Sequence, residues 1–380
     1  MTFQLNENQE MCRDLARDFA EKQCRPRIEE FEKNNSCPKD IYKLMGDIGL
    51  LGIVYDEKYG GMGLGHDCYA LVVEELSKAA VCVPAALRAN NMFCEAINMF
   101  GTEEQKEQFI PKHIAGDSCG SFAFTEPGTG SDPKQLTSTY REEGDFYILN
   151  GTKRFITNAG YEGMVLVFAK DEKTGDLSAF AFDKFCEGYS LSNAWEMMGY
   201  IGSPVYDIFM DNIRVPKANL IGGIGNGFKV LKNLIAFSKL GLSASYVGNM
   251  ERAYELAVKY AKEKIHRDKA ISKFPTIQTR IADIAAKCEA SKYLVYHLAE
   301  MSDDISKRDA VLAQSALVKA YVSDTSVDVC HSALAVMGAY GPAKEYEVER
   351  CMRDAAQSTQ IEGVVDMQRI IFGRWKLFSE

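Results

Sequence analysis

The sequence predicts an α+β protein of three domains, in which a β-domain stands between two helical domains. Apolar residues recur at helical spacing through residues 1–118 and again, in longer stretches, through residues 229–380. Between these regions, residues 119–228 contain short β-type runs separated by turn residues. The chain has 380 residues, of which 46% are hydrophobic, and this is enough for two to three domains.

The first helical domain begins with a capping signal. Asn6 is followed three positions later by Gln9, and apolar residues then repeat at helical spacing. A second helix is predicted to open at Pro38 and to end near Gly49. The glycine-rich stretch YGGMGLG lacks G-x-G-x-x-G spacing after a strand, so we interpret it as a connector.

The middle domain carries the strand signals. The stretch DFYILNGTKRFIT contains two short β-type runs around Asn150 and Gly151. Both residues tolerate positive φ, so a hairpin turn is predicted there. The runs MVLVFAK, LSAFAF and VYDIFMDNIRVP continue the strand pattern, and DEKTGD supplies a turn.

The helices of the last domain are predicted to be long. One apolar stripe follows Ile277, Ile281, Ile284 and Cys288. A second extended helical stretch ends at the glycines of MGAYG. Long helices joined by short loops indicate an antiparallel bundle.

Composition and charge exclude several classes of protein. The formal net charge of -9, with no basic cluster, argues against binding to nucleic acid or anionic membranes. The amino terminus lacks a secretory layout, and the 11 cysteines are scattered without a C-x-x-C pair. We therefore expect reduced thiols and a cytoplasmic location. The five histidines form no ligand pattern, so no metal site is expected.

Three short stretches are candidates for chemistry. FAFTEPGTGSD follows a β-type run and offers backbone N–H groups and hydroxyls, as a ligand loop or a plain turn does. KRFITN places an aromatic ring two residues before a threonine. The ring could stack on a ligand while the threonine donates its hydroxyl, or the ring could lie in the core with the threonine on the surface. In QIEGVVD, Glu362 stands between apolar residues and a glycine. It is either an ordinary solvated acid or an acid held away from water to transfer a proton.

Together with other segments, these stretches resemble the acyl-CoA dehydrogenase family along almost the whole chain. The segments, in order, are GTEEQKEQFIP (101–111), FAFTEPGTGSD (122–132), LNGTKRFITNAG (149–160), MMGYIGSP (197–204), DNIRVPKANLIG (211–222), GNGFKV (225–230), MGAYGPAKEYEVERCMRDA (337–355) and EGVVDMQR (362–369). The resemblance implies a helical amino-terminal domain, a β-domain and a carboxy-terminal four-helix bundle. It also implies a homotetramer that binds FAD between the β-domain and the bundle.

The resemblance assigns residues to the flavin ring and to CoA. Phe122, Phe124 and Thr125 would face the ring, with the threonine hydroxyl as a hydrogen-bonding group. Phe155 stands where the family usually has tryptophan, and Thr157 stands where it has a hydroxyl near the reactive N5. Ser131 would meet the CoA moiety.

Glu362 falls at the family's catalytic base, in the register set by RDA before it and QR after it. The implied reaction removes the α-proton of an acyl-CoA while a hydride leaves the β-carbon for flavin N5, giving a 2,3-enoyl-CoA. Apolar neighbours strengthen a carboxylate as a base, so we expect Glu362 in a dry setting. Gly363 is expected among the substrate contacts, where backbone N–H groups hold the developing enolate oxygen.

Several departures from the family concern the adenine and pyrophosphate half of FAD. The usual Arg-x-x-Phe-Gly appears as KIHRDK, with Lys264 for the arginine and Arg267 and Asp268 for the last two residues. Lysine keeps the charge but loses the planar fork of arginine. The usual glutamine, second glycine and threonine are Ala335, Ala339 and Val364. We expect FAD to be contacted by Lys264, Arg267, Gly338 and Asp366. The alternative is that a different subunit of a mixed tetramer supplies the missing FAD contacts.

Other departures concern the substrate. Family positions that contact CoA are Ala236 and Lys239, and the alternative glutamate of branched-chain members is Ser238. The helix expected at the end of the acyl pocket carries Arg88 and, three residues on, Asn91. A desolvated arginine favours an anion, which suggests an acidic, polar or cyclic acyl group. The alternative is that Arg88 points to solvent or pairs with Glu95.

These observations leave three functional hypotheses. The first is an FAD-dependent acyl-CoA dehydrogenase that passes electrons to an electron-transfer flavoprotein. The second is an enoyl-CoA reductase that runs the reverse reaction. The third is a non-redox subunit of a mixed oligomer that binds acyl-CoA or catalyses an elimination, with weakly bound or no FAD.

Overall fold

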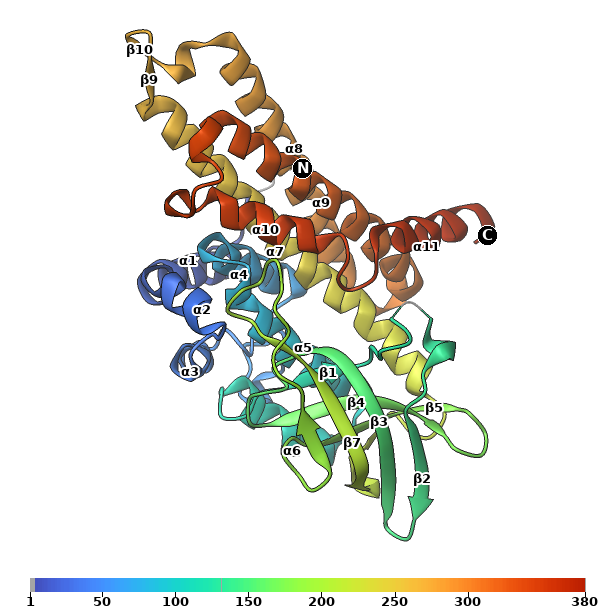
Figure 1. The fold of residues 1–380 in the computed structure, drawn as a ribbon. Coiled ribbons are helices and arrows are strands. Elements are labelled where there is room, and N and C mark those ends of the chain that lie inside the picture. The colour runs from blue at the N-terminus through green and yellow to red at the C-terminus, as the bar shows by residue number, and fades with distance from the viewer. Residues whose placement is uncertain (1–3, 131, 380) are drawn as a thin grey trace.

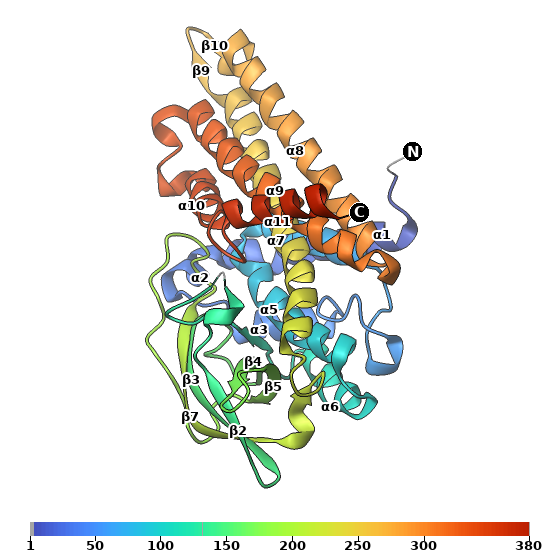
Figure 2. The same ribbon diagram turned by 90° about the vertical axis from the view of Figure 1, so that its right-hand side faces the viewer.

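A computed structural model describes residues 4–130 and 132–379 of the protein. Helices of the amino-terminal part pack beside a central long helix, the β-domain occupies one end of the molecule, and a helical bundle occupies the other (Figures 1 and 2). The elements follow the predicted order of helices, strands and helices, which confirms the predicted fold class.

The amino-terminal part contains six α-helices within the described residues. They are α1 (Glu7–Phe19), α2 (Ile28–Asn34), α3 (Lys39–Asp47), α4 (His66–Ala79), α5 (Cys82–Phe100) and α6 (Glu103–Ile114). The predicted capping box is present, because the Asn6 side chain accepts from the Gln9 N–H while the Gln9 side chain accepts from the Asn6 N–H. α4 and α5 are buried along most of their length, and both contact the central helix.

The β-domain is a twisted, mostly antiparallel sheet. Its strands are β1 (Ser121–Ala123), β2 (Thr139–Glu143), β3 (Phe146–Thr157), β4 (Met164–Asp171), β5 (Leu177–Asp183), β6 (Tyr189–Leu191), β7 (Val205–Pro216) and β8 (Leu220–Ile221). The order is β6-β7-β3-β2-β4-β5-β8, and β1 pairs in parallel with β4. β1 also contacts α5 and β3, so the loop that leaves β1 begins beside this helix.

The predicted hairpin at Asn150–Gly151 is wrong. β3 runs without a turn from Phe146 to Thr157, and the chain reverses before it, at Gly144, whose φ is +59°. Pairing with β7 along this whole length holds β3 extended, with a bulge beside Gly151. Gly151 remains specifically required, because a Cβ there would stand 2.3 Å from the Ser138 Oγ.

The carboxy-terminal part consists of long helices. They are α7 (Gly227–Glu263), α8 (Pro275–Ser302), α9 (Arg308–Met337), α10 (Val348–Ser358) and α11 (Val365–Phe378), with a two-stranded hairpin of β9 (Ile265–His266) and β10 (Lys269–Ala270) between α7 and α8. α7 runs from the β-domain to this hairpin at the far end of the bundle (Figure 1). The predicted stripe on α8 faces the bundle, since Ile284 and Cys288 are buried.

Two apolar cores support this arrangement. The larger one joins the amino-terminal helices, the bundle and one face of the sheet, and the smaller one fills the other face of the sheet. The shared core fixes α5 and α7 relative to β4 and β5 of the sheet. Within the described part of the chain, none of the helices combines the length and apolar character that crossing a membrane requires.

Candidate active site

Glu362 lies in the tight turn between α10 and α11. Its φ is +52° and that of Gly363 is +92°, so both residues adopt the left-handed region. A Cβ at Gly363 would stand 2.2 Å from the Gln368 Nε2, which explains a glycine there. The turn is held from α9, where the buried Lys319 donates to the Gly363 carbonyl over 2.7 Å. Strain of this kind in a non-glycine residue is typical of functional sites.

Two side chains from different helices contact the Glu362 carboxylate. Arg88 of α5 forms an ion pair with one oxygen, and the Ser238 hydroxyl of α7 donates to the other. The carboxylate is therefore not alone among apolar neighbours, and the expectation of a dry, isolated acid is wrong. Its side chain is 25% exposed, so the carboxylate is held in place but still accessible.

Arg88 is buried and points toward Glu362. It neither reaches solvent nor pairs with Glu95, so the alternative placement expected for it is wrong. Its other contact is the Tyr200 hydroxyl at 3.5 Å. The Tyr200 backbone N–H donates in turn to Asp354 of α10, over 2.7 Å. Arg88 thus connects α5, the loop after β6 and the turn that carries Glu362.

Two lysines add positive charge beside this turn. Lys239 of α7 and Lys319 of α9 are both buried. Burial lowers the pKa of each to about 8, and the pKa of Lys239 is lowered further by Lys319, although Glu362 opposes the shift in both cases. The charge of Glu362 raises the pKa of both lysines, so they lie near enough to add positive charge to the surroundings of the Glu362 turn.

The residues expected at the flavin ring lie on β1, the loop after it and β3. Phe122 and Phe124 pack edge-on against Phe168, and Phe124 is buried. Thr125 is half-buried, and its carbonyl accepts from the Arg154 N–H of β3 over 2.7 Å. This contact ties the loop to the strand that carries Phe155 and Thr157.

Phe155 presents its ring to the outside. It is 46% exposed, has a φ of +59°, and its ring centroid lies 5.1 Å from that of Trp195. Trp195 is fixed by its indole N–H, which donates to Asp207 over 2.9 Å. Two accessible aromatic rings beside the half-buried Thr157 hydroxyl fit the flat face and polar edge of a flavin ring.

A buried ion pair stiffens the loop after β1. The Lys153 ammonium lies 2.7 Å from the Glu126 carboxylate and also donates to the Phe168 carbonyl over 2.6 Å. The same carboxylate accepts from Thr137 and Ser138. Every lone pair of this buried group therefore has a donor nearby, which favours one loop conformation. Ser131, expected to contact CoA, lies outside the described residues.

The residues expected at the adenine half of FAD lie elsewhere. Lys264 ends α7 with its ammonium 4.8 Å from the centre of the Tyr340 ring, close to Gly338 at the end of α9. Arg267 is exposed in the turn between β9 and β10. This group lies at the far end of the bundle from the β-domain (Figure 1). Asp366 is separate from it, in the first turn of α11, where it pairs with Arg369.

α5 connects the two halves of the site. Its Ala86 carbonyl accepts from the Asn158 side chain over 2.9 Å, next to Thr157, while Arg88 pairs with Glu362. Asn91 lies one turn further along α5 on the face of Arg88. It is fully buried, and within the described part of the chain neither its side-chain nitrogen nor its side-chain oxygen has a hydrogen-bond partner.

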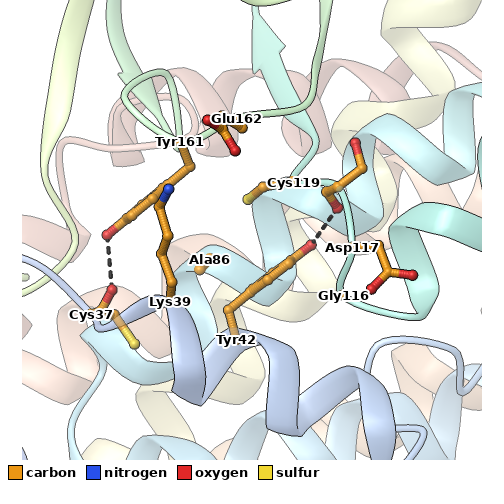
Figure 3. Close-up of a pocket in the computed structure, with 10 residues that line it drawn as sticks. Cys37, Lys39, Tyr42, Ala86, Gly116, Asp117, Cys119, Tyr161 and Glu162 are labelled. Atoms are coloured by element: carbon orange, nitrogen blue, oxygen red, sulfur yellow. Dashed lines mark hydrogen bonds between the residues drawn. The ribbon is translucent and has the colours of Figure 1, made fainter.

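A separate pocket lies across α5 from Glu362. It is lined by Cys37, Lys39, Tyr42, Ala86, Gly116, Asp117, Ser118, Cys119, Tyr161 and Glu162. Figure 3 shows Tyr42 and Tyr161 on its walls, each held by a hydrogen bond to a backbone carbonyl. Ala86 and Arg88 are two residues apart on a helix, so their side chains point to nearly opposite sides. None of the candidate site residues lines this pocket.

Sequence reasoning missed Lys319, Trp195 and Tyr200. Lys319 had a detectable signal, because it lies in a run of small and apolar residues at the spacing of a buried helix face, with Ala316 and Val322. Trp195 and Tyr200 come from the irregular segment between β6 and β7, and the sequence had no signal for their neighbours.

Comparisons with known proteins agree with this geometry. Three family models match in order: the acyl-CoA dehydrogenase N-terminal domain over residues 6–117, the middle domain over 121–213 and the C-terminal domain over 225–377. The 3-(aryl)acrylate reductase of Clostridium sporogenes is 35% identical, over 96% of this chain and 97% of that protein. The caffeyl-CoA reductase-Etf complex subunit CarC of Acetobacterium woodii is also 35% identical, over the same shares.

Among solved structures, butyryl-CoA dehydrogenase from Megasphaera elsdenii superposes with a TM-score of 0.94 at 32% identity, over 99% of this chain and 100% of that one. Family models, relatives and fold thus agree over the full length. The chain belongs to the acyl-CoA dehydrogenase family, whose members are FAD-dependent oxidoreductases that act on the CH–CH bond of acyl-CoA thioesters.

Proposed function

We propose that this protein interconverts a saturated acyl-CoA and its 2,3-enoyl-CoA, and that Glu362 moves the α-proton. One observation carries the assignment: the Glu362 carboxylate is fixed by side chains from two different helices and yet remains accessible. A general base must be held within hydrogen-bond reach of its proton, and a positive-φ turn is a strained place to keep an ordinary surface acid.

The neighbouring residues position this carboxylate. Arg88 and Ser238 each hold one carboxylate oxygen of Glu362 in place. Lys319 holds the backbone of the turn in place through its hydrogen bond to the Gly363 carbonyl. The Gly363 N–H is our candidate for the donor to the thioester oxygen, where negative charge develops as the α-proton leaves. Lys239 adds positive charge near the same place.

FAD is the cofactor of this family, and when bound it accepts or returns the hydride of the β-carbon. We propose that Phe122, Phe124 and Thr125 bind its ring together with Phe155 and Thr157. Support comes from the accessible Phe155 and Trp195 rings and from the contact between Thr125 and Arg154. The group at the far end of the bundle, Lys264, Arg267 and Gly338, is proposed to hold the adenine half of a neighbouring subunit's FAD.

Dehydrogenation with an electron-transfer flavoprotein as acceptor is the first direction that we propose. The reverse, reduction of an enoyl-CoA, is the second, and it is supported by two relatives that are named as reductases, one of them in an Etf complex.

A homotetramer is the proposed assembly. The 11 cysteines are all unpaired, which supports the proposed cytoplasmic location.

The test is anaerobic reduction of the bound flavin by acyl-CoA thioesters, followed by absorbance. The flavin is expected to bleach in the wild type and in a Lys287→Met control, which removes an exposed ion pair between Lys287 of α8 and Asp328 of α9. Glu362→Gln is expected to bind FAD and thioester but to bleach at least about a thousandfold more slowly, because no base takes the α-proton.

Two results would count against the proposal. Near-normal bleaching by Glu362→Gln would remove Glu362 from the reaction. Purified protein without flavin bands, even after addition of FAD, would favour the non-redox alternative of a subunit that only binds acyl-CoA or catalyses an elimination.

A further inference from the structure

The polar face of α5 continues past the base. Arg88, Asn91 and Glu95 are spaced by three and four residues, so they share one face of the helix, and all three are buried. The face points toward α4 and α7, since Arg88 reaches Glu362 beside Ser238 of α7. Asn91 therefore lies about one helical turn beyond Arg88, on the same face of α5.

Asn91 stands apart from its neighbours because its side chain is unsatisfied. Its backbone carbonyl accepts from the Tyr55 hydroxyl over 3.1 Å, so the helix is fixed at this point. Asn90, the next residue back, has both amide atoms engaged, with the Gly120 N–H and the His113 carbonyl. Asn91 has neither atom engaged, although it is fully buried. A buried amide left without partners costs about 1–3 kcal/mol, so a partner at this position is favoured.

The chemistry of that partner is restricted by the charges around it. Arg88 is already paired with Glu362 and offers little attraction for another anion. Glu95 follows Asn91 by four residues on the same face, and its carboxyl oxygen accepts a hydrogen bond from the Asn98 side-chain amide. An anionic group beside Asn91 would therefore lie between two carboxyl side chains. A neutral group that both donates and accepts would satisfy the oxygen and the nitrogen of Asn91.

Aromatic residues form the neighbouring wall. Tyr69 of α4 stacks on Phe237 of α7, with ring centroids 4.9 Å apart and an angle of 25° between the planes. Burial raises the pKa of the Tyr69 hydroxyl, which also interacts with the charges of Arg88, Glu362 and Glu95. The buried Tyr69 ring is therefore fixed against α7 by its stacking on Phe237, and the flat surface of such a ring suits a planar group.

We propose that Asn91 is a specificity-determining residue that hydrogen-bonds a hydroxyl at the far end of the acyl group, so that this site selects neutral, hydroxyl-bearing acyl thioesters, with a hydroxyaryl ring as the best fit. The inference rests on the proposed function, because it assumes that the acyl group extends from Glu362 along α5. The sequence suggested an acidic, polar or cyclic acyl group because of Arg88. The present inference restricts that range of substrates to neutral polar acyl groups.

The experiment measures binding without turnover. Oxidised, FAD-loaded wild type and Asn91→Leu are titrated by calorimetry with enoyl thioesters, which the oxidised flavin cannot reduce. The probes are the CoA thioesters of 3-phenylacrylate, of its 3-hydroxyphenyl and 4-hydroxyphenyl forms, and of its 4-carboxyphenyl form. Leucine has the same number of side-chain heavy atoms as asparagine, branched at the same carbon, but it offers no hydrogen bond. The plain phenyl probe is the matched control ligand.

Wild type is expected to bind the better hydroxyphenyl isomer about tenfold more tightly than the phenyl form, the size of one buried neutral hydrogen bond. Asn91→Leu is expected to reduce that preference to less than about twofold, without weakening the phenyl form. The 4-carboxyphenyl form is expected to bind wild type more weakly than either hydroxyphenyl isomer.

Three results would overturn the inference alone: equal binding of phenyl and hydroxyphenyl forms by wild type, a preference that survives in Asn91→Leu, or tightest binding of the carboxyphenyl form. If Asn91→Leu does not fold, the inference is still tested by comparing the affinities of wild type for the phenyl, hydroxyphenyl and carboxyphenyl thioesters. Absence of binding by every thioester would instead overturn the proposed function.

Discussion

At the scale of single residues, the arrangement around Glu362 depends on Arg88. A carboxylate on a strained turn has several rotamers, and productive proton transfer needs one of them. The Arg88 ion pair and the Ser238 hydrogen bond select it from opposite sides. Arg88 is itself buried, so its cost of desolvation is offset only while Glu362 is in place.

Replacing Arg88 by Met is expected to slow flavin reduction by acyl-CoA at least about tenfold, because a misplaced base loses the alignment that supports transfer. FAD content is expected to stay at the wild-type level, since Arg88 does not belong to the aromatic group at Phe155. Arg88→Lys is expected to recover part of the rate. Stopped-flow absorbance measures both variants, and unchanged reduction by Arg88→Met would contradict a positioning role.

At the scale of elements, the loop after β1 owes its shape to Lys153 of β3. The lysine is fully buried and holds Glu126 together with two backbone carbonyls. Burial opposes ionisation of Glu126, but Lys153 and the Thr137 and Ser138 donors lower its pKa to about 2. A buried pair of this kind adds little net stability, yet loss of one partner leaves the other charge uncompensated.

Lys153→Met is therefore expected to lower the free energy of unfolding by about 3–5 kcal/mol. The double variant Lys153→Met, Glu126→Gln removes both charges and is expected to recover part of this loss. Urea unfolding followed by circular dichroism measures both variants. A double variant no more stable than the single one would show that the pair contributes through packing and not through charge.

A second prediction at this scale concerns α6. Burial lowers the pKa of His113 to about 3, and the charges of Lys112 and Lys184 lower it further, although the hydrogen bond to the Phe109 carbonyl opposes this shift. In the unfolded chain a histidine takes up a proton near pH 6.5. Below that pH the unfolded state binds more protons than the folded state, so the stabilising effect of neutral His113 is lost as pH falls from 6.5 toward 3.

Between pH 7.5 and pH 5.5, wild type is expected to lose about 1.4 kcal/mol more unfolding free energy than His113→Asn, whose side chain does not titrate. Urea denaturation at the two pH values gives the difference, in which the other titrating groups cancel. Equal losses in the two proteins would show that His113 is protonated in the folded state.

At the scale of the whole molecule, the two halves of the proposed FAD site are far apart. The aromatic group at Phe155 belongs to the β-domain, whereas Lys264 and Arg267 lie at the opposite end of the bundle (Figure 1). One FAD that needs both must therefore join two subunits. This geometry supports an oligomer as the functional unit.

Mixing two inactive variants tests this arrangement. Arg267→Glu is expected to lose FAD from the neighbouring subunit, and Glu362→Gln is expected to lose flavin reduction in its own. Co-expressed, they are expected to form mixed oligomers in which an intact Glu362 meets an intact Arg267 across subunits, so activity returns to about a quarter of wild type or less, given random mixing. No recovery in purified mixed oligomers would place Arg267 and Glu362 in the same site of one subunit.

Local signals in the sequence determined the order of elements and most of the candidate residues. The capping box at Asn6 and the stripe on α8 were predictable because they depend on residues three or four apart. The position of Glu362 was predictable because flanking motifs fix its register. Such features need only neighbours along the chain.

Tertiary structure alone decided which groups surround those residues. Arg88 and Glu362 are 274 residues apart, and only the packing of α5 against the turn after α10 joins them. In the same way, pairing with β7 overrode the hairpin signal at Asn150–Gly151. The packing around α5 also leaves the Asn91 side chain without a hydrogen-bond partner among the described residues. Contacts between distant parts of the chain determine the charges around Glu362, its exposure to solvent and the conformation of its turn. The sequence by itself therefore identified Glu362 as the candidate acid, and only the tertiary structure determined its surroundings.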